Sequence, residues 1–301
     1  MTDDPATVAE FERLRPALTG LAYRMLGSLS EAEDVVQNAF LRWRAADQAQ
    51  VRQPRAFLYQ VVTRLCLDEL KSARARRESY VGTWLPEPVL DQAGLAPDRS
   101  GAELAQDLSF ALLLTLERLT PNERAAFILH DVFELEFREV GEALGQSEVA
   151  CRQLAARART HLREPRARFQ PSAEARGQLM GTFLAAVATG DVEALRRLLA
   201  EDAVYYADAG GRFSAALKPI RGADRIARFF AGVRVKFPLP EGAFPRLALI
   251  NGMPGVVIET DAQVLQTFAC EIDAGGRVAA IYTTRNPDKL RHVSAATLSP
   301  I

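Results

Sequence analysis

The chain has 301 residues, of which 48% are hydrophobic and 25% charged, and its formal net charge is −1. This composition is ordinary for a folded globular protein and argues against a disordered or fibrous chain. The length suits two or three domains of roughly 100–150 residues each. The best apolar runs fall far short of the roughly 20 residues of a membrane-spanning helix, and the acidic N-terminus lacks a signal sequence. We therefore expect a cytoplasmic protein.

Cysteine content and charge distribution narrow the class further. Cys66, Cys151 and Cys270 are isolated and odd in number, so neither a disulfide framework nor a zinc pattern is present, and no cofactor is expected. Basic residues gather in two short segments: Lys71, Arg74, Arg76 and Arg77, and then Arg152, Arg157, Arg159, Arg163, Arg166 and Arg168. A neutral chain with two basic segments can touch DNA locally but is expected to bind it poorly alone.

The first segment is predicted to be helical as far as about Arg77. Ser30 and Glu33 match a capping box at the start of an amphipathic helix, and a second amphipathic helix follows Pro54. From residue 79 to about 101 the helical periodicity stops, and glycine and proline become frequent. This stretch is predicted to be a linker.

A helix-turn-helix is predicted in the second segment. Thr120 and Glu123 form a capping box with proline between them, which marks a helix start. Further on, a helix over 137–144, a turn at Gly145 and a helix opened by Ser147 complete the motif. The last helix carries arginine and glutamine opposite its apolar side, which suits the major groove of DNA. A solvated basic face on an ordinary bundle helix is the alternative.

The third segment, after residue 171, is predicted to be an α+β domain. Two helices are expected at 173–189 and 192–200, separated by Gly190 and Asp191. Strand-like runs follow at 203–206, 246–250, 255–260, 264–272 and 278–284, with a hairpin turn at Gly275 and Gly276.

Two stretches of the chain resemble a known family. SEAEDVVQNAFLRWR at 30–44, followed by PRAFLYQVVTRLCLDELKSARARRE at 54–78, resembles region 2 of extracytoplasmic-function sigma factors, and 119–162 resembles their region 4. The match covers most of residues 10–165. The region found between these two in larger sigma factors is missing, which is typical of this group.

The resemblance implies roles for matched positions. Binding of core RNA polymerase would fall to Asp34, Val35, Gln37, Phe40 and Trp43. The minus-10 element would be contacted by Arg55, Arg64, Asp68, Lys71 and Arg74, and the minus-35 element by Arg152, Gln153 and Arg157. One position departs from the pattern, because many relatives have asparagine where Arg64 stands.

The third segment resembles SnoaL-like domains, which are cone-shaped folds with a curved sheet. Three strings resemble a sigma subgroup that carries this fusion: WLPEP at 84–88, DAGGRF at 208–213, where the subgroup usually has DGGGKV, and NPDKL at 286–290. The residues expected to regulate the sigma domains are therefore Trp84, Leu85, Pro86, Asp208, Gly210, Gly211, Asn286, Pro287, Asp288, Lys289 and Leu290.

Catalysis by this third domain is not expected. SnoaL-like enzymes commonly use histidine as a base, and no histidine lies between residues 171 and 291. A small-molecule ligand remains open, because Tyr205, Tyr206, Asp208 and Tyr282 could line a pocket.

The sequence thus predicts a sigma factor with no enzymatic activity of its own, which joins core RNA polymerase and directs it to promoter DNA. Its domains are expected at 1–78 (region 2), 79–103 (linker), 104–168 (region 4) and 172–291 (SnoaL-like). Two alternatives are a ligand-responsive helix-turn-helix regulator and a DNA-binding module fused to a SnoaL-type isomerase or cyclase.

Overall fold

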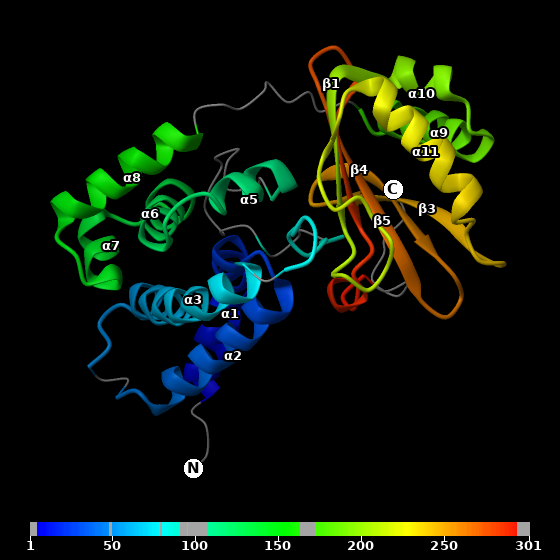
Figure 1. Ribbon diagram of the computed structural model, residues 1–301. Helices are drawn as coiled ribbons and strands as arrows, with labels where there is room; N and C mark the ends of the chain where they lie inside the picture. The colour runs from blue at the N-terminus through cyan, green and yellow to red at the C-terminus, as the bar shows by residue number, and fades with distance from the viewer. Residues whose placement is uncertain are drawn as a thin grey trace. The chain divides into compact units, whose positions relative to one another are not determined.

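The computed structural model describes residues 5–47, 50–78, 80–90, 95, 108–162 and 172–293, with the backbone alone at 72–78 and 173. The chain divides into two compact units (Figure 1): Met1–Ser79 with Gln92–Glu164, and Tyr80–Asp91 with Pro165–Ile301. Part of the expected linker therefore belongs to the second unit. We call its described residues, 80–90, the strap.

The first unit is built from helices only, among the residues that the structure describes. Its elements are α1 (Pro5–Leu26), α2 (Leu29–Ala45), α3 (Pro54–Glu78), α5 (Phe110–Leu116), α6 (Pro121–Phe127), the π-helix η1 (Ile128–Val132), α7 (Phe137–Leu144) and α8 (Glu148–Leu162). Helices α1, α2 and α3 bury their apolar faces against one another, with Leu21, Trp43 and Leu58 at most 2% exposed. Trp43 also donates a hydrogen bond from Nε1 to the Thr7 carbonyl at 2.9 Å.

The predicted helix-turn-helix is confirmed, while one predicted helix start is wrong. Thr120 caps α6 with a complete capping box, and Gly145 ends α7 at φ 64°, a left-handed conformation that glycine adopts without strain. Helix α2, however, begins two residues before the predicted position. Its cap is Ser28, whose side chain accepts from the Glu31 backbone, whereas Ser30 lies inside the helix and contacts Ser28 at 3.0 Å.

The second unit is an α+β domain with one mixed six-stranded sheet. Its helices are α9 (Ala173–Thr189), α10 (Val192–Leu198), α11 (Ala223–Lys236) and the short 3₁₀ turn η2 (Pro287–Lys289). The strands β1 (Leu199–Asp208), β2 (Ile220–Arg221), β3 (Phe244–Ile250), β4 (Met253–Glu259), β5 (Val264–Ile272) and β6 (Val278–Thr284) are ordered β2-β1-β6-β5-β4-β3. Among the strands that the structure describes, only β1 and β6 pair in parallel.

Several predicted elements of this unit are confirmed, and others need correction. The strands at 264–272 and 278–284 have the predicted bounds, but α10 ends at Leu198 rather than at residue 200. Strand β1 begins at once with Leu199, because Leu199 pairs with Val278 of β6. The prediction missed helix α11 and the short strand β2 entirely.

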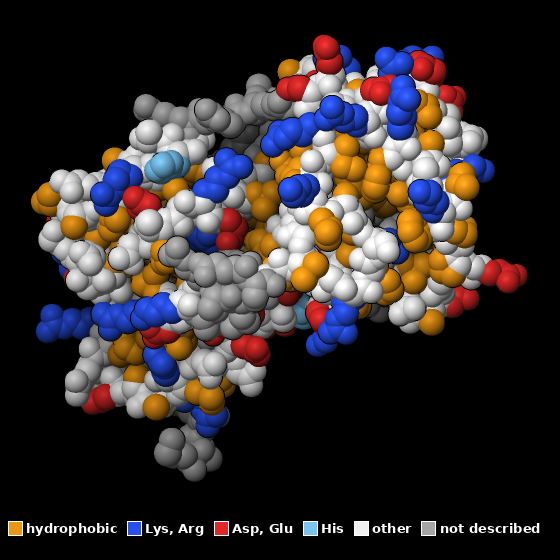
Figure 2. Space-filling model, in the orientation of Figure 1, with side chains coloured by type: hydrophobic (Ala, Val, Ile, Leu, Met, Phe, Trp, Pro, Cys, Tyr) orange, Lys and Arg blue, Asp and Glu red, His pale blue; other side chains and the backbone are white. Residues whose placement is uncertain are grey.

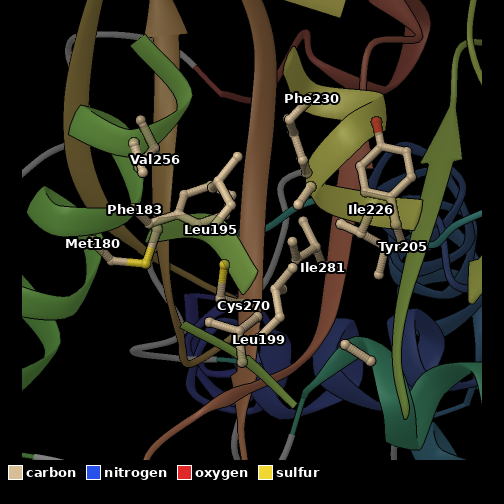
Figure 3. Packing of buried hydrophobic residues seen from close by; sticks show 14 of the residues in the cluster. Met180, Phe183, Leu195, Leu199, Tyr205, Ile226, Phe230, Val256, Cys270 and Ile281 are labelled. Atoms are coloured by element: carbon tan, nitrogen blue, oxygen red, sulfur yellow. The ribbon is translucent and has the colours of Figure 1, made fainter. Parts of the chain in front are cut away.

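The core of the second unit lies between the sheet and helices α9, α10 and α11, which cover one face of it (Figure 1). Figure 3 shows side chains from both layers meeting there, among them Phe183, Tyr205, Phe230, Cys270 and Ile281. The Phe183 and Phe230 rings meet edge to face at 5.5 Å. Burial raises the pKa of the Cys270 thiol to about 12, so this cysteine behaves as an apolar core residue.

The three cysteines, Cys66, Cys151 and Cys270, are free and buried. None of the helices in the described part of the chain is both long and apolar enough to cross a membrane.

Candidate functional site

The exposed face of α8 carries the side chains predicted to read DNA. Its buried residues are Cys151, Ala155 and Ala158, and the opposite side is exposed. We call this exposed side the α8 stripe; it consists of Arg152, Gln153, Ala156, Arg157 and Thr160. The three predicted minus-35 residues therefore lie together on one side of the second helix of the helix-turn-helix.

The two arginines of the α8 stripe have different ion-pair partners. Arg152 pairs with Glu148, one turn earlier on the same helix. The Arg157 Nε atom lies 3.2 Å from Oε1 of Glu123 on α6. Both arginine side chains are 61% exposed, so neither is withdrawn from solvent.

Helix α3 carries the residues predicted to face the minus-10 element. Gln60, Arg64, Asp68 and Lys71 follow one another at helical spacing, and we call them the α3 face. Lys71 and Asp68 are exposed and form an ion pair at 2.8 Å. Arg55 lies in the first turn of α3, and the side chain of Arg74 lies outside the described residues.

The α3 face and Arg55 donate hydrogen bonds to the segment around α7. Arg64 donates from Nη2 to the Glu142 carbonyl at 3.0 Å and from Nε to the Ala143 carbonyl at 3.3 Å. Gln60 donates to the same Glu142 carbonyl at 2.8 Å, and Arg55 donates to the Phe133 carbonyl at 3.1 Å. The last carbonyls of a helix lack partners within the helix and favour positive charge. Arg64 therefore caps the C-terminal end of α7.

An open cleft of about 530 Å³ lies beside these hydrogen bonds. Its walls come from α3, from the start of α6 and from the turn after α7. They are formed by Arg64, Leu67, Asp68, Lys71, Thr120, Pro121, Asn122, Ala143, Leu144 and Gly145. The helix predicted to contact the minus-10 element thus lies directly against α6 and α7 of the segment that carries the predicted minus-35 residues.

The residues predicted to bind polymerase divide between the surface and the core of α2. Asp34 and Gln37 are exposed, whereas Val35 and Trp43 are buried and pack in the core of the first unit. Phe40 is half-buried and packs against Phe11 with ring centroids 4.8 Å apart. The prediction missed Leu41, which is 53% exposed and follows Asp34 and Gln37 at helical spacing on the same side.

In the second unit, Asp208 joins the three motifs of the predicted regulatory set. Its side chain is completely buried and accepts hydrogen bonds from the Leu85 backbone at 2.8 Å, the Tyr80 hydroxyl at 2.5 Å and the Gly210 backbone at 3.1 Å. Lys289 completes the ion pair at 2.7 Å. We call Tyr80, Leu85, Asp208, Asn286 and Lys289 the node.

Lys289 also contacts the strap directly. Its ammonium group also donates to the Leu85 carbonyl and lies 4.3 Å from the centroid of the Trp84 ring. Asn286 donates to the Tyr80 hydroxyl at 2.9 Å. Burial and the Asp208 carboxylate raise the pKa of Tyr80, which keeps its hydroxyl protonated as a donor. The buried Asp208 carboxylate thus has one cation and three hydrogen-bond donors as partners, so its burial leaves no hydrogen-bonding requirement unmet.

The glycines of the second motif are needed for this close contact. Gly210 has φ 59°, and a Cβ there would stand 2.5 Å from the Asn286 side-chain nitrogen. Gly211 has φ 71° and lies against Val81 of the strap. Arg212 pairs with Asp288 at 3.1 Å on the exposed side. WLPEP, DAGGRF and NPDKL therefore meet in one place.

Of the three tyrosines suggested as lining a ligand pocket, Tyr206 and Tyr282 are brought together, whereas Tyr205 lies on the other face of the sheet. Tyr205 points into the core with Phe230, and its neighbour Tyr206 points to the opposite face of the sheet, as alternation along a strand requires. Tyr206 stacks on Tyr282 at 5.3 Å, and the Tyr282 hydroxyl donates to Glu271 at 3.0 Å.

The sequence-based prediction missed two residues that help to hold the strap, Tyr80 and Asn251. Tyr80 precedes the WLPEP string yet donates to Asp208. Asn251 binds the far end of the strap: its backbone N–H donates to the Val89 carbonyl at 2.8 Å, and its side-chain Oδ1 accepts from the Val89 backbone N–H at 2.9 Å. Asn251 has φ 51°, unusual for a residue other than glycine. An asparagine beside Gly252 was the available signal for such a turn.

Comparison with known families agrees with this arrangement. The model described as Sigma-70 region 2 matches residues 11–76, that for Sigma-70 region 4 matches 109–162, and that for the SnoaL-like domain matches 181–293. The chain is 40% identical to the ECF RNA polymerase sigma factor SigJ of Mycobacterium tuberculosis, over 94% of this chain and 92% of that protein. The chain belongs to the ECF sigma factors.

Other relatives of this sigma factor share its full length. The probable ECF RNA polymerase sigma factor SigI of Mycobacterium tuberculosis is 30% identical over 95% of both chains. The crystal structure of SigJ superposes with a TM-score of 0.71 at 38% identity, covering 95% of this chain and 98% of that one. The predicted combination of two helical sigma domains with a SnoaL-like α+β domain is thus confirmed. The first unit holds regions 2 and 4, and the second unit holds the SnoaL-like domain.

Proposed function

We propose that this sigma factor directs core RNA polymerase to a promoter with two separated elements, using α3 for the minus-10 element and the α8 stripe for the minus-35 element. The observation that carries the assignment is the α8 stripe, which exposes arginine and glutamine together on the second helix of a helix-turn-helix. Such a helix enters the major groove, where arginine pairs with guanine and glutamine with adenine. Asp34, Gln37 and Leu41 on α2 then form the surface for polymerase.

The contact between α3 and α7 supports a closed form of the free sigma factor. The two promoter elements are separate stretches of DNA, and about a dozen base pairs between them already span roughly 40 Å of B-DNA at 3.4 Å per pair. A compact body of about 150 residues is only about 40 Å across. Regions 2 and 4 must therefore separate before both elements are bound, and the hydrogen bonds of Arg55, Gln60 and Arg64 must break.

Core polymerase is the ligand that would favour the separated form. A ligand shifts such an equilibrium only through its higher affinity for one of the two forms. In the closed form the donors of Arg64 are occupied by the Glu142 and Ala143 carbonyls, so minus-10 binding and closure compete for the same side chain. This competition accounts for arginine at a position where many relatives have asparagine.

The SnoaL-like domain is proposed to regulate the first unit through the strap. The chain leaves the first unit after Ser79, runs through the second unit as the strap, and returns at Gln92. Because the strap lies between regions 2 and 4 in the chain, the node determines how much of the linker between them is bound to the second unit. Releasing the strap lengthens the free linker and changes the entropic cost of bringing the two regions together.

Neither alternative function is favoured by a specific observation. An ordinary helix-turn-helix regulator has no use for the segment 11–76, which matches sigma region 2. An isomerase or cyclase in the second unit would need a base, and the two tyrosines at 205 and 206 face opposite sides of the sheet. Asp208 is committed to the strap. A small-molecule ligand of this domain stays a proposal.

Transcription from a purified system tests the assignment. We expect promoter-specific transcripts only when core polymerase and this chain are combined, and weak DNA binding by the chain alone. Specific DNA binding by the isolated chain that does not change when core polymerase is added would contradict the proposal and favour an ordinary regulator.

A further inference from the structure

Three side chains from different elements of region 4 stack beside the α8 stripe. His130 lies in the π-helix η1, Phe137 is the first residue of α7, and Arg152 lies on α8. The His130 and Phe137 rings are nearly parallel, with centroids 3.8 Å apart and an interplanar angle of 26°. The Arg152 guanidinium carbon lies 5.5 Å from the centroid of the Phe137 ring. The Phe137 ring thus contacts both the imidazole and an arginine of the α8 stripe.

The imidazole under Phe137 is held in place by the backbone. His130 Nδ1 lies 2.8 Å from the Leu135 carbonyl oxygen. A carbonyl can only accept, so Nδ1 carries the proton and donates this hydrogen bond. The π-helical turn around His130 is closed by a hydrogen bond from the Phe133 nitrogen to the Ile128 carbonyl at 3.0 Å. The stack therefore rests on a fixed base rather than on a mobile side chain.

We propose that Phe137 is a positioning residue for minus-35 recognition, which it serves by holding the plane and direction of the Arg152 guanidinium. The proposal rests on the proposed function, because it assumes that Arg152 reads a base. Bidentate pairing with guanine requires the guanidinium fork to present two N–H groups in one plane. A long, exposed arginine loses rotamer freedom when it does so. Contact with the ring removes part of that freedom before DNA arrives.

Glu148 supplies the second constraint on the same guanidinium. It lies one turn before Arg152 on α8 and pairs with it, so it moves with the recognition helix into the groove. Phe137 belongs to α7, the other helix of the helix-turn-helix. Its contact with Arg152 therefore depends on the angle between α7 and α8. Arg157 differs, because its partner Glu123 lies on α6. The position of Arg152 near the start of α8 is the one from which recognition helices contact base edges.

Base-pair selectivity is the readout that separates positioning from general stability. The full chain with core polymerase is assayed on a promoter set in which each minus-35 base pair is replaced in turn. The variants are Phe137→Met, which keeps an apolar side chain without a ring, Phe137→Tyr, which keeps the ring, Arg152→Ala, and the double variant Phe137→Met with Arg152→Ala. Transcription from an unchanged promoter and binding to core polymerase report whether each variant is folded.

We expect Phe137→Met to relax selectivity about two- to five-fold at the same base pair that Arg152→Ala relaxes, the range typical of an exposed cation–π contact. Phe137→Tyr should keep the wild-type selectivity. The double variant should match Arg152→Ala alone, because the ring then has no guanidinium to hold. Phe137→Leu, a second variant without a ring, should repeat the result of Phe137→Met.

A matched control is available in the second unit. Phe213 is 52% exposed, and Arg285 lies over its ring at 5.4 Å, so Phe213→Met removes an equivalent contact away from region 4. It should leave minus-35 selectivity unchanged. Uniform loss of activity on all promoters with Phe137→Met, or additive effects in the double variant, would overturn the positioning role. If the wild-type chain with core polymerase gives no promoter-specific transcription at all, the proposed function itself is overturned.

Discussion

The node of the second unit and the α8 stripe of the first use similar side chains for opposite purposes. At the node, Asp208 is fully buried and Lys289 is 9% exposed, and both bind the backbone of the strap. In the α8 stripe, the side chains of Arg152 and Arg157 are 61% exposed, and each pairs with a carboxylate of a neighbouring residue in region 4. Charged groups that fix the chain are buried and satisfied internally, whereas those proposed to contact DNA remain exposed to water.

The α3 face lies between these two cases. Arg64 is exposed, yet it donates to two backbone carbonyls of α7. Its hydrogen bonds therefore resemble those of the node, while its accessibility resembles that of the α8 stripe. An arrangement of this kind suits a contact that must form and break during function.

The largest effect on stability is expected at the node. Lys289→Met leaves the Asp208 charge buried without its cation, which costs about 3–5 kcal/mol when a buried pair is broken in this way. We expect a lower thermal unfolding midpoint and faster proteolysis within the strap. Core-dependent transcription should also change, because the strap joins regions 2 and 4.

The matched control for this substitution is Arg212→Met. Arg212 pairs with Asp288 in the same unit, but the two side chains are 62% and 46% exposed. Exposed pairs contribute about 0–1 kcal/mol, so this variant should unfold and transcribe nearly as the wild type does. Equal effects of the two substitutions would show that burial of the Lys289 pair has no special role.

An intermediate effect is expected on α3. Arg64→Asn removes two hydrogen bonds to α7 carbonyls, worth together about 1–2 kcal/mol. The closed form should be destabilised by that free energy relative to the separated form. Core polymerase should then bind up to about 5- to 30-fold more tightly. Energy transfer between labels on regions 2 and 4 of the free chain should report a larger separation.

Arg138→Asn is the control for the α3 experiment. Arg138 is an exposed arginine on α7 that pairs with Glu142 of the same helix at 3.2 Å. Its replacement should leave core affinity and label separation unchanged. If Arg64→Asn instead lowers promoter binding without changing either quantity, Arg64 serves minus-10 readout and does not restrain the closed form.

Local patterns predicted the parts of this molecule whose contacts are short in sequence. The Thr120 capping box, the Gly145 turn and strands β5 and β6 follow from residues a few positions apart. The start of α2 was misplaced because Ser28 and Ser30 have the same capping chemistry, and only the folded backbone chooses between them. The family resemblance supplied the node motifs.

The remaining parts depend on distant contacts that no local pattern encodes. Helix α11 was missed although Ile226, Ala227 and Phe230 have helical spacing, because its far end carries exposed residues such as Val235 and Phe237. Figure 2 shows how often apolar side chains reach the surface of the unit that contains α11, which weakens any inference from exposure patterns. The hydrogen bonds of Arg64 to α7 likewise join residues nearly eighty positions apart.

The smallest effect on stability is expected in the α8 stripe, where the functional effect should be the most specific. Gln153→Ala and Arg157→Ala alter exposed side chains, so each should change the free energy of unfolding by no more than about 0.5 kcal/mol. Each should nonetheless cost about 1–3 kcal/mol in promoter binding and relax preference at one minus-35 position. Base contacts and phosphate contacts differ in this respect, because a phosphate contact weakens binding on every sequence by a similar factor. Affinities measured with core polymerase on single-base-pair variants of the minus-35 element decide between them. A uniform loss across all sequences for both variants would assign Gln153 and Arg157 to the DNA backbone and leave Arg152 as the reader of sequence among the three.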